Sequence, residues 1–324
     1  MAKLGVTGSD AEQPSATVAD QASRLQEAGL NFAMIHIVTP TSATSVLSHL
    51  GYSGLRLAGI PALARRLSSG GVVLAYHNVV RRGHTPSPGD PGAHIELDRF
   101  VDQVDWIRRR YAVVPLTEMI GRLSAGRSLR GLLALTFDDG YRGTVTEALP
   151  ILEALALPAT LFIVGDAPGR STPFWWDDPA RANGPGAPFP DTRLPAGWEE
   201  LRRAARAGFE IGAHSMHHHD LTLLDRDELA DDLRACAERL SLHLGVRPAT
   251  FAYPYGRWNA RVRDVVRAAG FIGAVTLDGG PNGRRADPWA LHRQNIPAGI
   301  GAAAFECWTA GVRPPRKASC TSPS

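Results

Sequence analysis

Residues 132–140 read Leu-Leu-Ala-Leu-Thr-Phe-Asp-Asp-Gly, a short apolar run that ends in two adjacent carboxylates and a glycine. The run Leu132 to Thr136 has the length of one buried strand, and the leucines at 149, 152 and 155 that follow have helical spacing. The same succession repeats along the chain from residue 72. The candidate strands are 72–76, 112–114, 132–136, 159–164, 209–213, 250–253, 272–275 and 291–296.

This alternation of strand and helix predicts an α/β fold in which helices cover a parallel sheet. Seven or eight repeats are enough to close the sheet, so we expect a distorted (β/α) barrel of seven or eight parallel strands. An open, doubly wound sheet is the alternative. The main domain is expected over residues 67–310, between a poorly ordered extension over 1–66 and a Pro-, Lys- and Ser-rich disordered tail over 311–324.

Charge and targeting signals restrict the class of protein. The formal net charge is +3 and the basic residues are scattered, which argues against a nucleic-acid partner. Residues 55–67 are expected to form a basic amphipathic helix that either packs on its own domain or makes a peripheral membrane contact. The N-terminus shows neither a signal peptide nor a spanning segment. As written, the chain is expected in the cytoplasm or at the membrane periphery, and outside the cytoplasm if its start is mis-assigned.

Polar residues follow four of the predicted strands. They are His77 after the first, Asp138 and Asp139 after the third, the histidine cluster from His214 after the fifth, and Pro254 to Gly256 after the sixth. In a parallel barrel the carboxyl ends of the strands meet on one face, where active sites lie. We therefore expect these side chains to converge.

The two adjacent carboxylates are expected to have different roles. Successive residues of an extended strand point to opposite sides, so Asp138 and Asp139 do not both contact one ion comfortably. One can bind a metal while its neighbour stays free as a base. A simple Asp-Asp-Gly turn is the structural alternative.

The histidine cluster predicts a metal site. His214 and His218 are four residues apart, so in a helical turn they face the same way and can share an ion. Together with Asp139 they make three ligands and leave positions for water and substrate, as in hydrolytic sites. This donor set suits Zn²⁺, with Co²⁺, Ni²⁺ or Fe²⁺ as alternatives. A solvated His-rich loop is the competing interpretation.

Three motifs in this order resemble those of the polysaccharide deacetylase family, of the NodB-homology type. They are Thr-Phe-Asp-Asp-Gly at 136–140, His-Ser-x-x-His at 214–218 and Phe-Ala-Tyr-Pro-Tyr-Gly at 251–256. The resemblance implies that Asp138 is the general base and that Asp139, His214 and His218 hold the metal. It further implies that Tyr255 borders the acetyl pocket, with its backbone N–H on the oxyanion, and that the product is a deacetylated glycan.

Two departures from the family pattern point to a subgroup. Many members carry a base-orienting Arg where this chain has Ala252, and a late general-acid His is missing. The segment Val-Leu-Ala-Tyr-His-Asn at 73–78 resembles the early Tyr-His of the poly-N-acetylglucosamine deacetylases, which implies that His77 is the acid, with His292 as the alternative. Arg293 is expected to replace the missing Arg; a surface ion pair is the other reading.

Aromatic residues near the motifs are candidates for substrate binding. Trp175 and Trp176, in a Pro- and Gly-rich loop, offer apolar faces to sugar rings, and Tyr253 and Pro254 belong to the third motif. The predicted partner is an N-acetylated oligo- or polysaccharide. The alternatives are an amidohydrolase that acts on a small amide or ureide with the same metal site, and an inactive glycan-binding protein.

Overall fold

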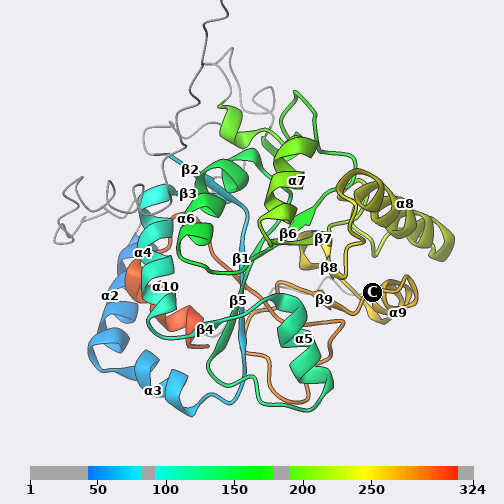
Figure 1. The fold of residues 1–324 in the computed structure, drawn as a ribbon. Coiled ribbons are helices and arrows are strands. Elements are labelled where there is room, and N and C mark those ends of the chain that lie inside the picture. The colour runs from blue at the N-terminus through cyan, green and yellow to red at the C-terminus, as the bar shows by residue number, and fades with distance from the viewer. Residues whose placement is uncertain (1–42, 82–91, 178–189, 313–324) are drawn as a thin grey trace, which may run out of the picture. The chain divides into compact units, whose positions relative to one another are not determined.

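The computed structural model describes residues 43–81, 92–177 and 190–312, with side chains from residue 50 onward (Figure 1). All of these residues belong to one compact unit, Thr41–Ser324. Residues 1–42 of the extension predicted over 1–66, and residues 313–324 of the tail predicted over 311–324, lie outside the described residues, so the predicted domain limits stay predictions.

An eight-stranded parallel sheet forms the centre of the described part of this unit. Its strands are β1 (Val72–Tyr76), β4 (Ala112–Val113), β5 (Leu132–Phe137), β6 (Thr160–Ile163), β7 (Glu210–Ala213), β8 (Thr250–Ala252), β9 (Gly273–Val275) and β10 (Gln294–Asn295). Hydrogen bonding follows the order β10-β1-β5-β6-β7-β8-β9, and β4 pairs with the start of β5. The middle strands are buried along almost their whole length, as expected for a parallel sheet covered by helices.

Residues 291–295 connect the two edges of the sheet. Leu291 donates its N–H to the carbonyl of Ala274 in β9 and accepts a hydrogen bond from the N–H of Thr276, just after that strand. Three residues later, Gln294 pairs with Leu74 of β1. The sheet therefore curls into a distorted (β/α) barrel, as predicted. The strand predicted over 291–296 is reduced to two residues because this segment crosses from one edge to the other.

Helices surround the strands (Figure 1). They are α4 (Leu97–Arg108), α5 (Leu116–Ser124), α6 (Leu149–Ala154), α7 (Trp198–Arg206), α8 (Arg226–Leu244) and α9 (Ala260–Ala268). The sequence explains the limits of α8, because the Asp225 side chain accepts hydrogen bonds from the N–H groups of Asp227 and Glu228. The helix ends at Gly245, whose φ of 70° lies in the left-handed region that glycine adopts without strain.

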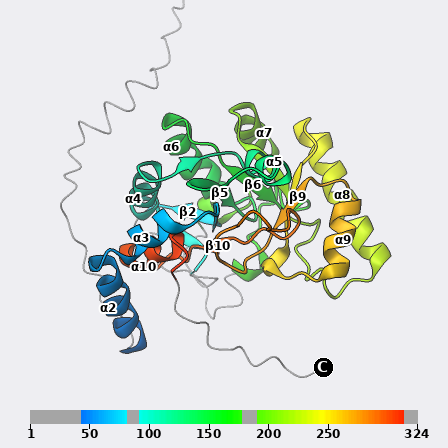
Figure 2. The ribbon, with the colours of Figure 1, turned by 90° about the horizontal axis from the view of Figure 1, so that it is seen from below.

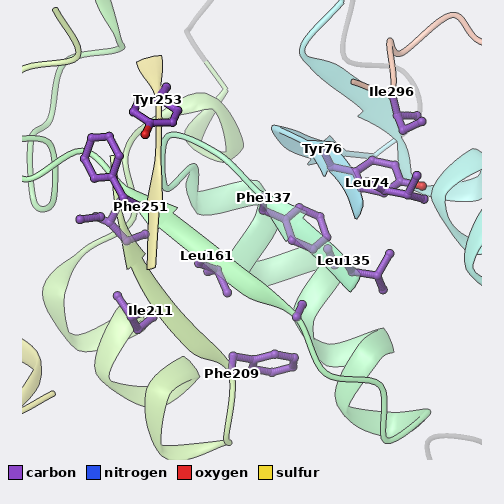
Figure 3. Close-up of a cluster of buried hydrophobic side chains, with 14 of the residues drawn as sticks. Leu74, Tyr76, Leu135, Phe137, Leu161, Phe209, Ile211, Phe251, Tyr253 and Ile296 are labelled. Carbon is purple, nitrogen blue, oxygen red and sulfur yellow. The ribbon is translucent and has the colours of Figure 1, made fainter. Parts of the chain in front are cut away.

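Strand side chains alternate between two hydrophobic clusters. Leu74 and Phe137 belong to the larger cluster, whose members from five strands are drawn in Figure 3. Val73 and Ala134 belong to a second cluster, which also contains Leu291. Thr136 lies two residues after Ala134, and Arg293 lies two residues after Leu291. Residues two apart in an extended segment point to the same side, so Thr136 and Arg293 point toward the interior that this second cluster fills.

Helices α2 (Ala43–Leu57), α3 (Ile60–Leu67) and α10 (Ala302–Thr309) lie together at one side of the unit (Figure 2). The single helix predicted over 55–67 is interrupted at Gly59, whose left-handed φ of 71° separates α2 from α3. Leu57 and Leu67 remain 89% and 75% exposed, and the peripheral membrane contact stays a prediction. Among the helices of the described residues, none combines the length and the apolar character that crossing a membrane requires.

Candidate functional site

The carboxyl ends of four strands bring the predicted residues to one end of the barrel. His77 follows β1, Asp138 and Asp139 follow β5, and His214 follows β7. The short helix η5 (Pro254–Gly256) comes one residue after β8. Because the strands are parallel, these ends share one face of the barrel.

Asp139, His214 and His218 form a candidate metal centre. One carboxylate oxygen of Asp139 lies 3.5 Å from Nε2 of His214 and 3.5 Å from Nε2 of His218. The three potential ligand atoms lie within 4.8 Å of one another, so a single ion can contact all of them. All three residues are buried, which rules out a solvated His-rich loop for them, whereas His217 and His219 are exposed.

The backbone that presents these ligands is unusual. Asp139, Ser215, His218 and Tyr255 have φ values of 70°, 61°, 58° and 58°, in the left-handed region that residues other than glycine rarely adopt. The hydroxyl of Ser215 accepts a hydrogen bond from the N–H of His218 at 2.8 Å. The expected helical turn is therefore wrong: a strained, non-helical turn brings His218 back beside His214, and such strain is concentrated at functional sites.

The protonation states suit a metal ligand set. His214 lies with Nδ1 2.8 Å from the carbonyl oxygen of Ala252, so Nδ1 donates to that carbonyl and Nε2 faces Asp139. Burial and the neighbouring His214 lower the pKa of His218 to about 4. Burial alone would raise the pKa of Asp139, but its hydrogen bond with His214 and the proximity of His218 lower it. Near neutral pH the site therefore holds a carboxylate and a neutral His218, the forms that bind metal.

The pKa of His214 is shifted in the opposite direction to that of His218. Burial by itself would lower the pKa of its imidazole, but the hydrogen bond with Asp139 and the charges of both aspartates raise it. The two carboxylates thus create a site that attracts a positive charge, whether a proton or a cation.

Asp138 is held by Arg293 through two hydrogen bonds. Nη1 and Nη2 of Arg293 lie 2.6 Å and 2.8 Å from the two carboxylate oxygens, and Nε donates to the carbonyl of Thr276 at 3.0 Å. Burial by itself would raise the pKa of Asp138, but Arg293, with help from His214, lowers it to about 2. Arg293 is fully buried, so the surface ion pair considered as its alternative role is wrong.

His77 and His292 occupy different environments. His77 lies close enough to Asp138, Asp139 and His218 to influence their ionisation, and its Nδ1 is buried without a hydrogen-bond partner among the described residues. His292 is exposed and precedes the inward-facing Arg293 in an extended segment. Of the two candidate acids, only His77 lies beside the carboxylates.

The residues of the third motif lie in two environments, the hydrophobic core and the candidate metal centre. Tyr253 is fully buried, and its hydroxyl donates to the carbonyl of Trp289 at 2.7 Å, so its side chain belongs to the core shown in Figure 3 and the predicted substrate contact is wrong. Pro254 is also buried. Tyr255 is 42% exposed, and its ring centre lies 4.6 Å from that of His218. Within the third motif, Tyr255 is thus the residue that combines solvent access with contact to the candidate metal centre.

Trp175 and Trp176 also differ in solvent exposure. Trp175 is 51% exposed and can receive a ligand on its exposed surface. Trp176 is partly buried, with its ring centre 4.5 Å from that of His218, and its Nε1–H donates to the hydroxyl of Tyr141 at 2.7 Å. Trp176 is thus a wall of the site, and Trp175 remains the candidate sugar platform.

Sequence reasoning missed a buried polar network behind this wall. It contains Tyr141, Asp177 and His94, of which Asp177 accepts hydrogen bonds from both of the others. Asp177 belongs to the short helix η2 (Trp175–Asp177), and His94 to β3 (His94–Glu96), which pairs with β2 (Asn78–Val80). The sequence contains one usable signal, since Tyr141 directly follows the Asp-Asp-Gly motif.

The residues present fit a divalent cation. Nε2 of His214, which becomes a ligand when an ion displaces its proton, the neutral His218 and the ionised Asp139 supply two nitrogen ligands and one oxygen ligand. Three protein ligands are typical of catalytic metal sites, which keep further positions for water and substrate.

Comparison with known proteins agrees with this geometry. Residues 126–274 match the family model described as polysaccharide deacetylase. The chain is 22% identical to YxkH of Bacillus subtilis (strain 168), a presumed polysaccharide deacetylase, over 179 residues that cover 55% of this chain and 56% of YxkH. It is 24% identical to the poly-beta-1,6-N-acetyl-D-glucosamine N-deacetylase of Escherichia coli (strain K12) over 243 residues, 65% of this chain and 34% of that protein.

The fold has close counterparts among solved structures. That of IcaB from Ammonifex degensii superposes with a TM-score of 0.59 at 23% identity and covers 75% of this chain and 98% of that one. The chain itself spans about half of YxkH and about a third of the Escherichia coli enzyme. The family match includes Asp138, Asp139, His214, His218 and the third motif, but not His77 or Arg293. On these grounds the resemblance of this chain to the polysaccharide deacetylase family, predicted from its three motifs, is confirmed.

Proposed function

We propose that this protein is a metal-dependent hydrolase that removes N-acetyl groups, or less readily O-acetyl groups, from an oligo- or polysaccharide. The observation that carries the proposal is the ionised, buried Asp138 directly beside the Asp139, His214 and His218 triad. A protein that only binds glycans has no need of a base next to three metal ligands. The names of the curated relatives support acetylated glycans as the substrate class.

Asp139, His214 and His218 would hold the ion, for which we propose Zn²⁺, with Co²⁺, Ni²⁺ or Fe²⁺ as alternatives. When bound, the ion supplies Lewis acidity to the acetyl carbonyl and to water. The chain itself must then supply a base, an acid, and groups that orient the substrate.

Asp138 is the proposed base. Its low pKa keeps it ionised, so it can accept the proton of the attacking water. The two contacts from Arg293 hold the carboxylate in one orientation, and each oxygen keeps a further lone pair for that proton. Arg293 therefore orients the carboxylate of Asp138, and it also lowers the pKa of Asp138, which makes the carboxylate a weaker base.

His77 is the proposed acid and Tyr255 the proposed oxyanion donor. Protonation of the amide nitrogen by His77 lets the C–N bond break and releases acetate and a free amine. The backbone N–H of Tyr255 donates to the acetyl oxygen as that oxygen gains negative charge. Trp175 offers its exposed ring to the sugar.

The proposal is tested by acetate release from chitooligosaccharides and from β-1,6-linked N-acetylglucosamine oligomers by the zinc-loaded protein. We expect wild type to release acetate, and Asp138→Asn and His77→Ala to lose about 10²-fold or more in rate, the usual contribution of a general acid or base. His218→Ala should lose metal and activity together. His219→Ala, which changes an exposed neighbour, is the matched control and should remain active.

Each contrary outcome removes a different part of the proposal. A fully active His77→Ala would remove the acid assignment alone. Wild type that binds metal but releases no acetate would favour hydrolysis of a small amide or ureide. Wild type that binds no metal would refute the enzyme assignment.

A further inference from the structure

The two histidines of the metal centre are oriented by different means. His214 is fixed by the hydrogen bond from its Nδ1 to the carbonyl of Ala252. His218 has no equivalent, because its Nδ1 is buried and has no hydrogen-bond partner among the described residues. Metal-binding imidazoles usually rely on such a bond for their orientation. Something else must therefore hold the His218 ring.

Aromatic rings pack against His218. The ring centre of Trp176 lies 4.5 Å away at an interplanar angle of 43°, and that of Tyr255 lies 4.6 Å away at 69°. Tyr255 is partly exposed, whereas Trp176 is also stacked with Phe174, with ring centres 4.8 Å apart and planes 12° from parallel. Of the two rings that pack against His218, that of Trp176 is therefore held by more contacts.

A directed series of hydrogen bonds fixes Trp176. Its Nε1–H donates to the hydroxyl of Tyr141 at 2.7 Å, and that hydroxyl donates in turn to Oδ2 of Asp177 at 2.6 Å. The indole can only donate, so the Tyr141 hydroxyl must accept from it and use its own proton toward Asp177. The orientation of Trp176 therefore depends on Asp177 as the final acceptor.

A second series reaches Asp177 from the other side. Nδ2 of Asn78 lies 2.9 Å from the carbonyl oxygen of Thr192, which can only accept, so the amide nitrogen is correctly placed there. The same nitrogen lies 3.0 Å from Nδ1 of His94. Nδ1 therefore accepts, and Nε2–H of His94 donates to Oδ1 of Asp177 at 3.1 Å. Both carboxylate oxygens of Asp177 are thus held.

Burial makes this arrangement hard to change. Asn78, Tyr141 and Asp177 are fully buried and His94 is 7% exposed. A buried carboxylate is tolerated only when donors satisfy it, and a buried Tyr or Trp needs a partner for its polar group. Arg193, also buried, adds a favourable charge near Asp177. The network therefore favours a single arrangement in which the indole stays against His218.

We propose that Asp177 and Tyr141 are positioning residues for the metal centre: through Trp176 they hold the His218 imidazole in the orientation that binds the ion. This inference rests on the proposed metal-dependent function and adds to it the means by which the third ligand is oriented. Neither residue touches the ligand atoms, so the effect is transmitted through packing against the His218 ring.

The test is the Zn²⁺ affinity of Tyr141→Phe, measured by competition with a chelator. This change removes the hydroxyl that joins Trp176 to Asp177 but keeps the ring and its packing on Phe174. We expect the affinity to fall about tenfold or more, the effect usual for residues that orient metal ligands. Trp176→Phe, which keeps a ring against His218 but removes the N–H, and Asp177→Asn should weaken binding in the same direction.

Tyr111→Phe is the matched control. Tyr111 is a buried tyrosine whose hydroxyl donates to the carbonyl of Thr309 at 3.1 Å, at the opposite side of the fold from the strand ends. It should lose stability as Tyr141→Phe does, yet bind Zn²⁺ as wild type. The visible spectrum of the Co²⁺-loaded proteins provides a second readout, which should change in Tyr141→Phe and not in Tyr111→Phe.

The outcomes separate this inference from the proposed function. If folded Tyr141→Phe and Trp176→Phe both bind Zn²⁺ as wild type and show the wild-type Co²⁺ spectrum, the positioning role is refuted, whatever the activity. If wild type binds Zn²⁺ but releases no acetate, the proposed function fails while the affinities still decide the role of Tyr141. If wild type binds no metal, both fail.

Discussion

At the scale of single residues, the pairing of Asp138 with Arg293 shows how this chain departs from the family pattern. Ala252 stands where the resemblance leads one to expect a base-orienting Arg, and Arg293 reaches the base from the segment that connects the two edges of the sheet. Ala252 and Leu291 belong to the same interior cluster. The guanidinium therefore approaches Asp138 from a different segment, and it makes two hydrogen bonds to the carboxylate.

Arg293→Lys tests this role. The substitution keeps a positive charge but cannot make both hydrogen bonds to Asp138. Loss of one charge-assisted hydrogen bond, worth about 1.5–3 kcal/mol, should lower kcat about 10- to 100-fold with little change in KM. Burial then raises the pKa of Asp138 above its wild-type value of about 2. Activity needs the ionised base, so the acid limb of the kcat/KM profile should move to higher pH.

An Arg293→Lys profile that coincides with that of wild type would contradict this account. Arg234→Lys is the control, because the ion pairs of Arg234 on α8 are exposed and join it to Asp231 and Glu238 rather than to Asp138. It should change neither the rate nor the profile.

At the scale of elements, the short helix η5 places Tyr255 beside His218 and depends on Gly256. Gly256 has a φ of 67°, and a Cβ added there would lie 2.6 Å from Cβ of Leu277 and 2.7 Å from its backbone nitrogen. No larger residue fits without moving the backbone. The conformation of Tyr255, with its own left-handed φ, is thereby tied to the segment after β9.

Gly256→Ala should therefore displace Tyr255. We expect a loss of about 1–3 kcal/mol in the free energy of unfolding, from the strained φ and the contact, measured by urea denaturation. The rate of acetate release should fall by more than this destabilisation explains. Gly270→Ala is the matched control, since φ is 90° there but the nearest atom to an added Cβ is a side-chain nitrogen of Arg247 at 3.8 Å. It should lose stability and keep full activity per folded molecule.

At the scale of the whole barrel, folding and metal binding are separable. The hydrophobic clusters that hold the strands and helices together contain none of the three ligands, so we expect the metal-free protein to fold. Zn²⁺ at about 1,000 times its dissociation constant should stabilise the native state by about 4 kcal/mol, seen as a rise in Tm. Addition of a chelator should reverse the rise.

Asp139→Ala is the control for the metal effect. It should fold but show no Zn²⁺-dependent rise in Tm, because one of the three ligands is missing. A wild-type Tm that does not respond to Zn²⁺ would mean that the triad does not bind the ion.

The sequence by itself determined the features that depend on neighbouring residues. Short apolar runs such as Leu132 to Thr136 have the length of a buried strand, and their regular alternation with helical patterns indicated the barrel. The position of Asp139 and His214 directly after such runs indicated their convergence, because parallel strands end on one face. Local order along the chain was enough for both conclusions.

Only the tertiary structure decided which distant side chains meet. The strained turn at His218 replaced the expected helical one, and the core took up the side chain of Tyr253, because packing overrides local pattern. The contact of Asp138 with Arg293 exists only once residues 291–295 join the two edges of the sheet. The network of Tyr141, Asp177 and His94 joins three separate segments, whose spacing carries no periodic signal. Contacts of this kind arise from closure of the barrel, and no local stretch of sequence encodes them.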